Sequence, residues 1–173
     1  MNPLNVFNNP YFSWKYPECW LKNIRMFFRS FKYAYQRITK GYAYCDTWDL
    51  DDYYTRLFVD SLTTFSKHMN GWPQSDEFPE FEDYQKYIDK MAYLFNQSIE
   101  GNEDIKNEYE EEYYEKIIHK PDFFKNLNNE KSPEEKELTD KYFKRENELY
   151  KYRKACRNEA LDMMKHIFDS LWW

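Results

Sequence analysis

Apolar side chains recur at spacings of three and four residues over four long stretches of the chain. Such spacing places them on one face of an α-helix, and it predicts helices over residues 18–40, 50–69, 82–100 and 133–171. A more charged stretch after Gly101 can form a further helix, and no comparable stretch of the sequence alternates as a strand does. The sequence therefore predicts an all-α fold, a single-domain bundle of four to five helices with a long C-terminal helix.

The apolar face of each predicted helix is the candidate core. In the third helix this face comprises Tyr84, Ile88, Met91, Phe95 and Ile99. In the first helix seven positions form one stripe of the kind that faces a core: Trp20, Ile24, Phe27, Phe28, Phe31, Tyr35 and Ile38. Chain ends seldom carry two tryptophans, so we expect Trp172 and Trp173 to dock into the bundle.

Composition supports one helical domain over residues 1–173. Two valines and three glycines are too few for a β-sandwich or a dinucleotide-binding domain, and aromatic residues make up 21% of the chain. Residues 101–133 are polar and charged, and we interpret them as an insertion or a peripheral helix and loop, with a loop over residues 126–133. Each glycine follows a predicted helix end, where a positive φ angle is expected.

A turn rich in acidic and aromatic residues separates the first two predicted helices. It follows the pattern G-[aromatic]-x-x-x-D-x-W-x-[L/F]-D-x-[Y], carried by Gly41, Tyr42, Asp46, Trp48, Leu50, Asp51 and Tyr53. We expect Asp46 and Asp49 to cap the second helix and order the turn, with Trp48 anchored in the core. The alternative is a divalent-cation site on Asp46, Asp49, Asp51 and Asp52, although the glycine and distal glutamate of an EF-hand are missing.

This turn resembles that of a widespread family of bacteriophage proteins that has no established activity. The family pattern continues with a G-x-P segment, an aromatic-rich helix and a helix ending in L-W. The corresponding pieces here are Gly71-Trp72-Pro73, residues 78–95 and Leu171-Trp172. The resemblance covers about residues 20–100 and 155–173, and the charged segment 101–154 departs from it. It implies a phage source and an α-helical fold, and it carries over no catalytic residue.

Charge is distributed unevenly along the chain. The net charge of −6 disfavours generic nucleic-acid binding, yet residues 1–40 carry +6 and residues 76–115 carry −11. Four cations of the first predicted helix follow three-four spacing and form what we call the basic stripe: Lys22, Arg25, Arg29 and Lys32. The stripe either contacts an anionic ligand or partner, or is neutralised by residues 76–115, which is the interpretation we favour. Those acidic residues could alternatively mimic nucleic acid.

No catalytic or metal-binding arrangement is evident in the sequence. Glycine-rich phosphate loops and nucleophile elbows are missing, and the three histidines, His68, His119 and His166, lack the usual metal-ligand spacings. We therefore expect no catalytic residues, no metal and no cofactor. Three scattered cysteines indicate reduced thiols, and without a run of about 18 apolar residues we expect no membrane partner and a location in the host cytoplasm.

These observations favour a phage-encoded, non-enzymatic helical protein that works by binding. Its partner would be a host or phage protein or a small anionic nucleotide, and counter-defence is one role that fits. A structural or assembly component of the phage particle is the alternative, and an enzyme with a site not visible in the sequence is the third hypothesis. Each of these hypotheses is compatible with an oligomer.

Overall fold

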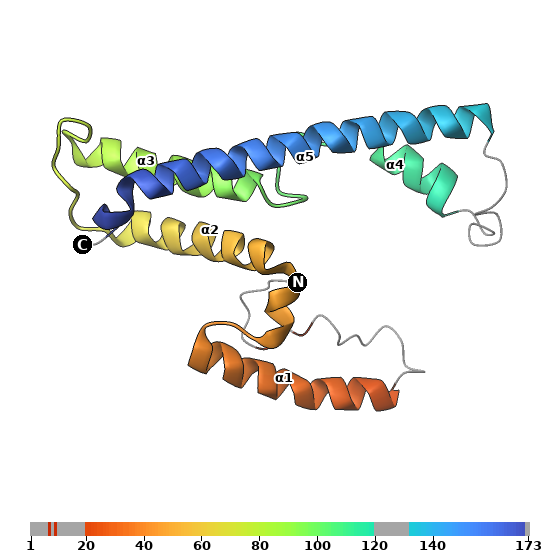
Figure 1. The fold of residues 1–173 in the computed structure, drawn as a ribbon, viewed down its shortest axis with the longest axis horizontal. Coiled ribbons are helices and arrows are strands. Elements are labelled where there is room, and N and C mark those ends of the chain that lie inside the picture. The colour runs from red at the N-terminus through yellow and green to blue at the C-terminus, as the bar shows by residue number, and fades with distance from the viewer. Residues whose placement is uncertain (1–6, 8, 10–19, 120–131, 172–173) are drawn as a thin grey trace.

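The computed structural model describes residues 7, 9, 20–119 and 132–171, and it is all-α over those residues, as predicted (Figure 1). The α-helices are α1 (Trp20–Lys40), α2 (Leu50–His68), α3 (Phe81–Gln97), α4 (Glu110–Tyr113) and α5 (Pro133–Ile167). Short helical turns complete the described chain: η2 (Tyr44–Asp49), η3 (Tyr114–Ile118) and η4 (Phe168–Ser170). The four long predicted helices are confirmed, with no end shifted by more than four residues.

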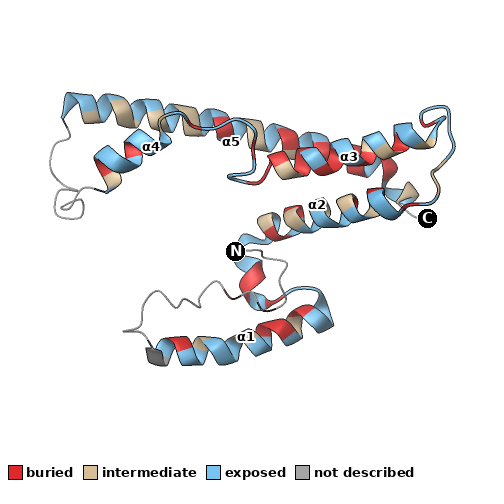
Figure 2. Ribbon diagram, turned by 180° about the vertical axis from the view of Figure 1, so that it is seen from behind, coloured by how far each residue is buried: buried red, intermediate tan, exposed pale blue. Residues whose placement is uncertain are grey.

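The core lies where α3 is packed between α2 and the C-terminal half of α5 (Figures 1 and 2). Tyr84, Ile88 and Met91 on α3 have no exposed surface, and Phe95 stacks at 5.1 Å between ring centroids on Phe58 of α2. The inward face predicted for α3 is therefore confirmed. The core is built from rings and methionines, which suits a chain with few branched aliphatic residues.

Helix α5 begins at a capping box. The Glu135 N–H donates to Ser132 Oγ at 3.2 Å, and the Ser132 N–H donates to the Glu135 carboxylate at 2.9 Å. With Pro133 at the first helical position, this confirms the predicted helix start. The predicted loop over residues 126–131 and the predicted docking of Trp172 and Trp173 lie outside the described residues.

The N-terminal half of α5 extends beyond the core and carries α4 and η3 along its side (Figure 1). Tyr113 stacks face to face on Tyr142 with ring centroids 4.0 Å apart. The Asn107 side chain donates to the Tyr142 carbonyl at 3.2 Å and to Glu146 at 2.8 Å. Residues 107–118 thus form a peripheral layer on α5.

Helix α1 stands apart from the bundle formed by α2, α3 and α5. Both ribbon views place it beyond α2, and it packs against the η2 turn (Figures 1 and 2). Gly41, directly after α1, and Gly101, after α3, have φ angles of 81° and 85°, as expected of glycines past a helix end. The same prediction is wrong for Gly71, whose φ angle is not positive.

Candidate functional site

A buried ion pair joins α1 to the turn that follows it. Arg37 Nε donates to Asp46 Oδ2 at 2.9 Å, and Arg37 Nη2 donates to Asp46 Oδ1. The side chains are only 4% and 6% exposed, and Asp46 Oδ2 also accepts the Ala43 N–H at 2.7 Å. A bidentate pair of this kind fixes both distance and orientation. Asp46 thus orders the turn through Arg37 and the Ala43 N–H, and it forms no cap bond to α2.

Tyr53 closes the same junction from α2. Its hydroxyl donates to the Gly41 carbonyl at 2.5 Å, so the end of α1 is bonded to the first turns of α2. Burial and the charge of Asp46 raise the pKa of Tyr53, and the same two causes raise the pKa of the Cys45 thiol to about 11. Arg37, Gly41, Asp46 and Tyr53 together are called the polar hinge below.

The polar hinge turns a different face of α1 inward from the one that the sequence predicts. The buried positions on α1 are Asn23, Tyr33, Ala34 and Arg37. The apolar stripe predicted to face a core is instead exposed by 47–73% at the six positions whose side chains are described, and these form what we call the contact face: Ile24, Phe27, Phe28, Phe31, Tyr35 and Ile38. The prediction was wrong because three-four spacing identifies an apolar face and not what covers it.

The basic stripe lies beside the contact face on the same helix. Lys22, Arg25, Arg29 and Lys32 are all exposed, and within the part of the chain that the structure describes none of them forms an ion pair with a carboxylate. The interpretation that residues 76–115 neutralise this stripe is therefore wrong for the described chain. The reason is the position of α1, which lies beyond α2 and away from those residues (Figure 1). This arrangement cannot be read from the sequence.

Three acidic residues of 76–115 contact basic residues or a histidine of α5, while Glu112 of α4 pairs with Lys116 of η3. Arg153 Nη1 lies 2.7 Å from Glu103 Oε1, Arg145 Nε lies 3.0 Å from Glu108, and His166 Nε2 lies 2.7 Å from Glu77. The Arg153–Glu103 pair is the most buried of these, with side chains 12% and 7% exposed. The excess negative charge of this segment is therefore partly satisfied within the bundle, and the basic stripe of α1 remains exposed.

The other turn residues singled out in the sequence analysis do not gather in one site. Trp48 is 74% exposed, so the prediction that it anchors the turn in the core is wrong. Asp49 occupies the N-cap position of α2 without a side-chain cap bond, so its predicted capping role is not seen. Asp51 pairs with Arg157 of α5 at 2.9 Å, which ties the start of α2 to the bundle. Asp46 turns inward to Arg37, so the four aspartates do not share a cation site.

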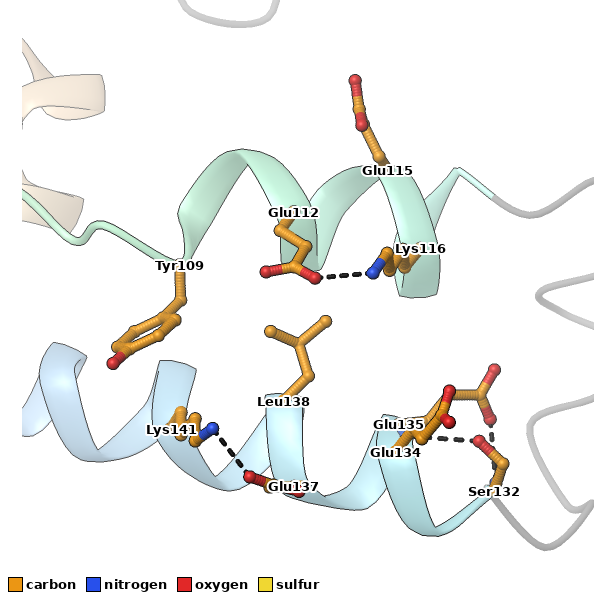
Figure 3. A pocket seen from close by; sticks show the side chains of 10 residues that line it. All are labelled: Tyr109, Glu112, Glu115, Lys116, Ser132, Glu134, Glu135, Glu137, Leu138 and Lys141. Carbon is orange, nitrogen blue, oxygen red and sulfur yellow. Dashed lines mark hydrogen bonds and ion pairs between the residues drawn. The ribbon is translucent and has the colours of Figure 1, made fainter.

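An open cleft of about 540 Å³ lies between α4 with η3 and the first turns of α5 (Figure 3). Five glutamates line it, and its two lysines are already paired, Lys116 with Glu112 at 2.6 Å and Lys141 with Glu137 at 2.7 Å. Glu135 is held by the α5 cap, as Figure 3 also shows. Among its described lining residues there is no histidine or cysteine, and the hydroxyl of Ser132 accepts the Glu135 N–H of the α5 cap.

Metal and membrane features complete the survey of the described residues. Within them, no group of three or more histidine, cysteine or acidic side chains is placed to hold a metal ion. No helix in the described part is both long enough and apolar enough to cross a bilayer. The exposed contact face with its adjoining basic stripe is therefore the candidate functional site.

Sequence reasoning identified the cations of this site and missed its apolar half. It assigned the rings of α1 to the core, and it did not single out Tyr44, which η2 leaves 67% exposed. A signal was available in the first predicted helix, where a third face carries Asn23, Ser30 and Arg37 and could have been the buried one. Comparison of the chain with family models, curated proteins and solved structures finds no match.

Proposed function

We propose that this chain is a non-enzymatic binding protein that attaches to a negatively charged partner through the contact face and the basic stripe of α1. The observation that supports the proposal is the exposure of six large apolar side chains on one helix, beside four cations that have no carboxylate partner among the described residues. Contiguous exposed apolar surface is typical of an interaction site. Cations at its rim attract and orient an anionic partner.

The resemblance of the turn to phage proteins suggests where this binding takes place. A phage source would put the protein in the host cytoplasm, and the partner would then be a host component that the phage occupies or recruits. The polar hinge contributes by holding α1 away from the bundle, so that the bundle does not cover its apolar face. No reaction is required of the protein in this role.

The test is the double variant Arg25→Glu with Arg29→Glu, compared with the matched control Lys151→Glu with Lys154→Glu. The control cations are exposed on α5 and carry no carboxylate partner within the described residues. Each purified protein is melted at low and high salt and used to capture partners from cell lysate divided into soluble and membrane fractions. We expect the α1 variant to lose the captured partner while its melting curve stays unchanged, and the control to keep both.

Two results would contradict the proposal. Equal capture by the parent and the α1 variant would show that the basic stripe takes no part in binding. A melting temperature that falls in the α1 variant at low salt but not at high salt would show that the stripe is neutralised within the chain, because exposed ion pairs are screened by salt.

A further inference from the structure

We infer that the partner of the contact face is an anionic phospholipid surface, on which α1 lies flat. This inference rests on the proposed function and names the chemistry of the partner. It starts from the composition of α1, which has six basic residues and no acidic residue in 21 positions. A helix with an aromatic apolar face and a strongly basic polar face is the kind that binds in the headgroup layer of a membrane.

The side chains of α1 are distributed around the helix as a position in the headgroup layer requires. At about 100° per residue, the contact face, the basic stripe and the face buried against the hinge occupy three separate sectors of the helix. Ile24 to Ile38 span 14 residues, about 21 Å at 1.5 Å per residue. Along this length Phe28 and Ile38 are 66% and 73% exposed. The result is an apolar face that can enter an acyl layer, joined by the exposed ring of Phe7, which lies edge-on to Phe31 at 6.1 Å between ring centroids. Long basic side chains lie beside this face and can reach back to the phosphates.

Charge favours a lipid surface over a protein partner. A partner that pairs with α1 must be negative along the whole length of the helix, because α1 offers no carboxylate to a cation. The anionic leaflet of a membrane is uniformly negative, which matches a helix without a single carboxylate. Two α1 helices from different copies would bring their like charges together, so self-association through this face is disfavoured.

The charge of the whole chain would orient it at such a surface. Residues 1–40 carry +6, and because the chain carries −6 in total, residues 41–173 carry −12. An anionic membrane therefore attracts α1 and repels the bundle, and the bundle lies on the other side of the hinge (Figure 1). Screening limits this repulsion to about 8 Å at physiological salt, so the bundle does not prevent binding. This inference departs from the expectation of no membrane partner, which was based on the lack of a spanning segment. A helix that lies on the surface needs no such segment, and no described helix is suited to span.

The test measures binding of the full chain to vesicles by sedimentation. Vesicles of phosphatidylcholine alone are compared with vesicles containing one third phosphatidylglycerol, at low and at high salt. We expect binding to the anionic vesicles, little binding to the neutral ones, and loss at high salt. Arg25→Gln with Arg29→Gln should lower the partition coefficient about 25-fold, since each cation near an anionic surface contributes about fivefold.

The apolar half of the inference is tested with Phe28→Ser combined with Ile38→Ser. We expect this variant to lower partition at least about tenfold, because both side chains would leave the acyl boundary. The matched control is Phe143→Ser with Leu161→Ser, two exposed apolar side chains on α5, which should bind as the parent does. Circular dichroism and melting of every variant check that the fold is retained.

The outcomes separate this inference from the proposed function. Binding to anionic vesicles that both α1 variants lose and the control keeps supports the inference. No vesicle binding by the parent, or equal binding by the α1 variants and the parent, overturns it. In another outcome, the protein fails to bind vesicles and still captures a partner from the soluble lysate fraction that the basic-stripe variant does not capture. In that case the partner is a soluble protein, and the proposed function stands while this inference does not. If neither binds, both fall.

Discussion

Replacing Asp46 by asparagine removes the charge from the polar hinge while leaving its shape nearly unchanged. The substitution removes the Asp46 carboxylate from the Arg37 guanidinium, which is 4% exposed, and it places an amide N–H₂ group against one of its two donors. Removing one partner of a buried ion pair costs about 3–5 kcal/mol, because the remaining charge stays desolvated. The Ala43 N–H also risks losing its acceptor at 2.7 Å.

This cost should fall on the docking of α1 and not on the bundle. Helix α1 packs on η2, whereas the core is formed by α2, α3 and α5. We therefore expect amide hydrogen exchange over residues 33–53 to quicken by up to about two to three orders of magnitude, given that each 1.4 kcal/mol is tenfold. Exchange over residues 84–95, in the centre of the core, should not change.

The control is Asp52→Asn, which breaks the half-exposed pair with Arg56 at 2.8 Å. Such a pair contributes about 0–1 kcal/mol, so exchange should quicken by less than about fivefold. Unchanged protection over residues 33–53 in Asp46→Asn would refute the assignment of the hinge as the element that holds α1. Equal loss of protection over residues 84–95 would refute the separation of α1 from the bundle, because the two would then open together.

Three further outcomes follow from burial and pKa. Phe95→Ala removes a ring that is 1% exposed, and we expect the free energy of unfolding measured in urea to fall by about 3–5 kcal/mol. A fall of less than about 1 kcal/mol would contradict the burial of this ring. Trp48→Ala, by contrast, should change stability by no more than about 0.5 kcal/mol, and a larger change would mean that the indole is packed. Burial raises the pKa of Cys45 to about 11 and of Tyr142 and Tyr152 to about 12, so the folded state keeps protons that the unfolded chain releases from about pH 9 upward. The melting temperature should therefore fall steadily from about pH 9 to pH 12, and a constant or rising value would contradict these shifts.

The sequence was sufficient for the bundle because local and tertiary signals agree there. On α3 the residues at three-four spacing are the ones that are buried, and on α5 the cap at Ser132 and Pro133 is formed by residues next to each other in the chain. Capping depends on contacts within one turn of helix, and periodicity depends on one helix at a time. Neither needs knowledge of a distant partner.

The candidate site could not be predicted in the same way because it depends on how α1 is rotated. That rotation is set by the pair between Arg37 and Asp46 and by contacts of Asn9, which donates to the Met26 carbonyl at 2.8 Å and to Ser30 Oγ at 2.9 Å. Polar Asn23 and Arg37 thus share the buried side of α1 with Tyr33 and Ala34, while most of the large apolar side chains lie outside. A rule that places apolar residues inside fails wherever polar groups are satisfied by directed bonds.

The polarity of the hinge accounts for the exposure of the contact face. An apolar junction would tolerate several rotations of α1, because apolar contacts have no preferred direction, and the rotation that buries most rings would be favoured. The Nε–H and Nη2–H groups of Arg37 donate together to the Asp46 carboxylate, and this bidentate geometry fits one orientation of the helix. Ile38 lies about 100° further around the same helix. Burying a charged pair adds little to stability, so its consequence here lies in orientation. The turn pattern that includes Gly41, Asp46 and Tyr53 thus fixes which face of α1 is exposed.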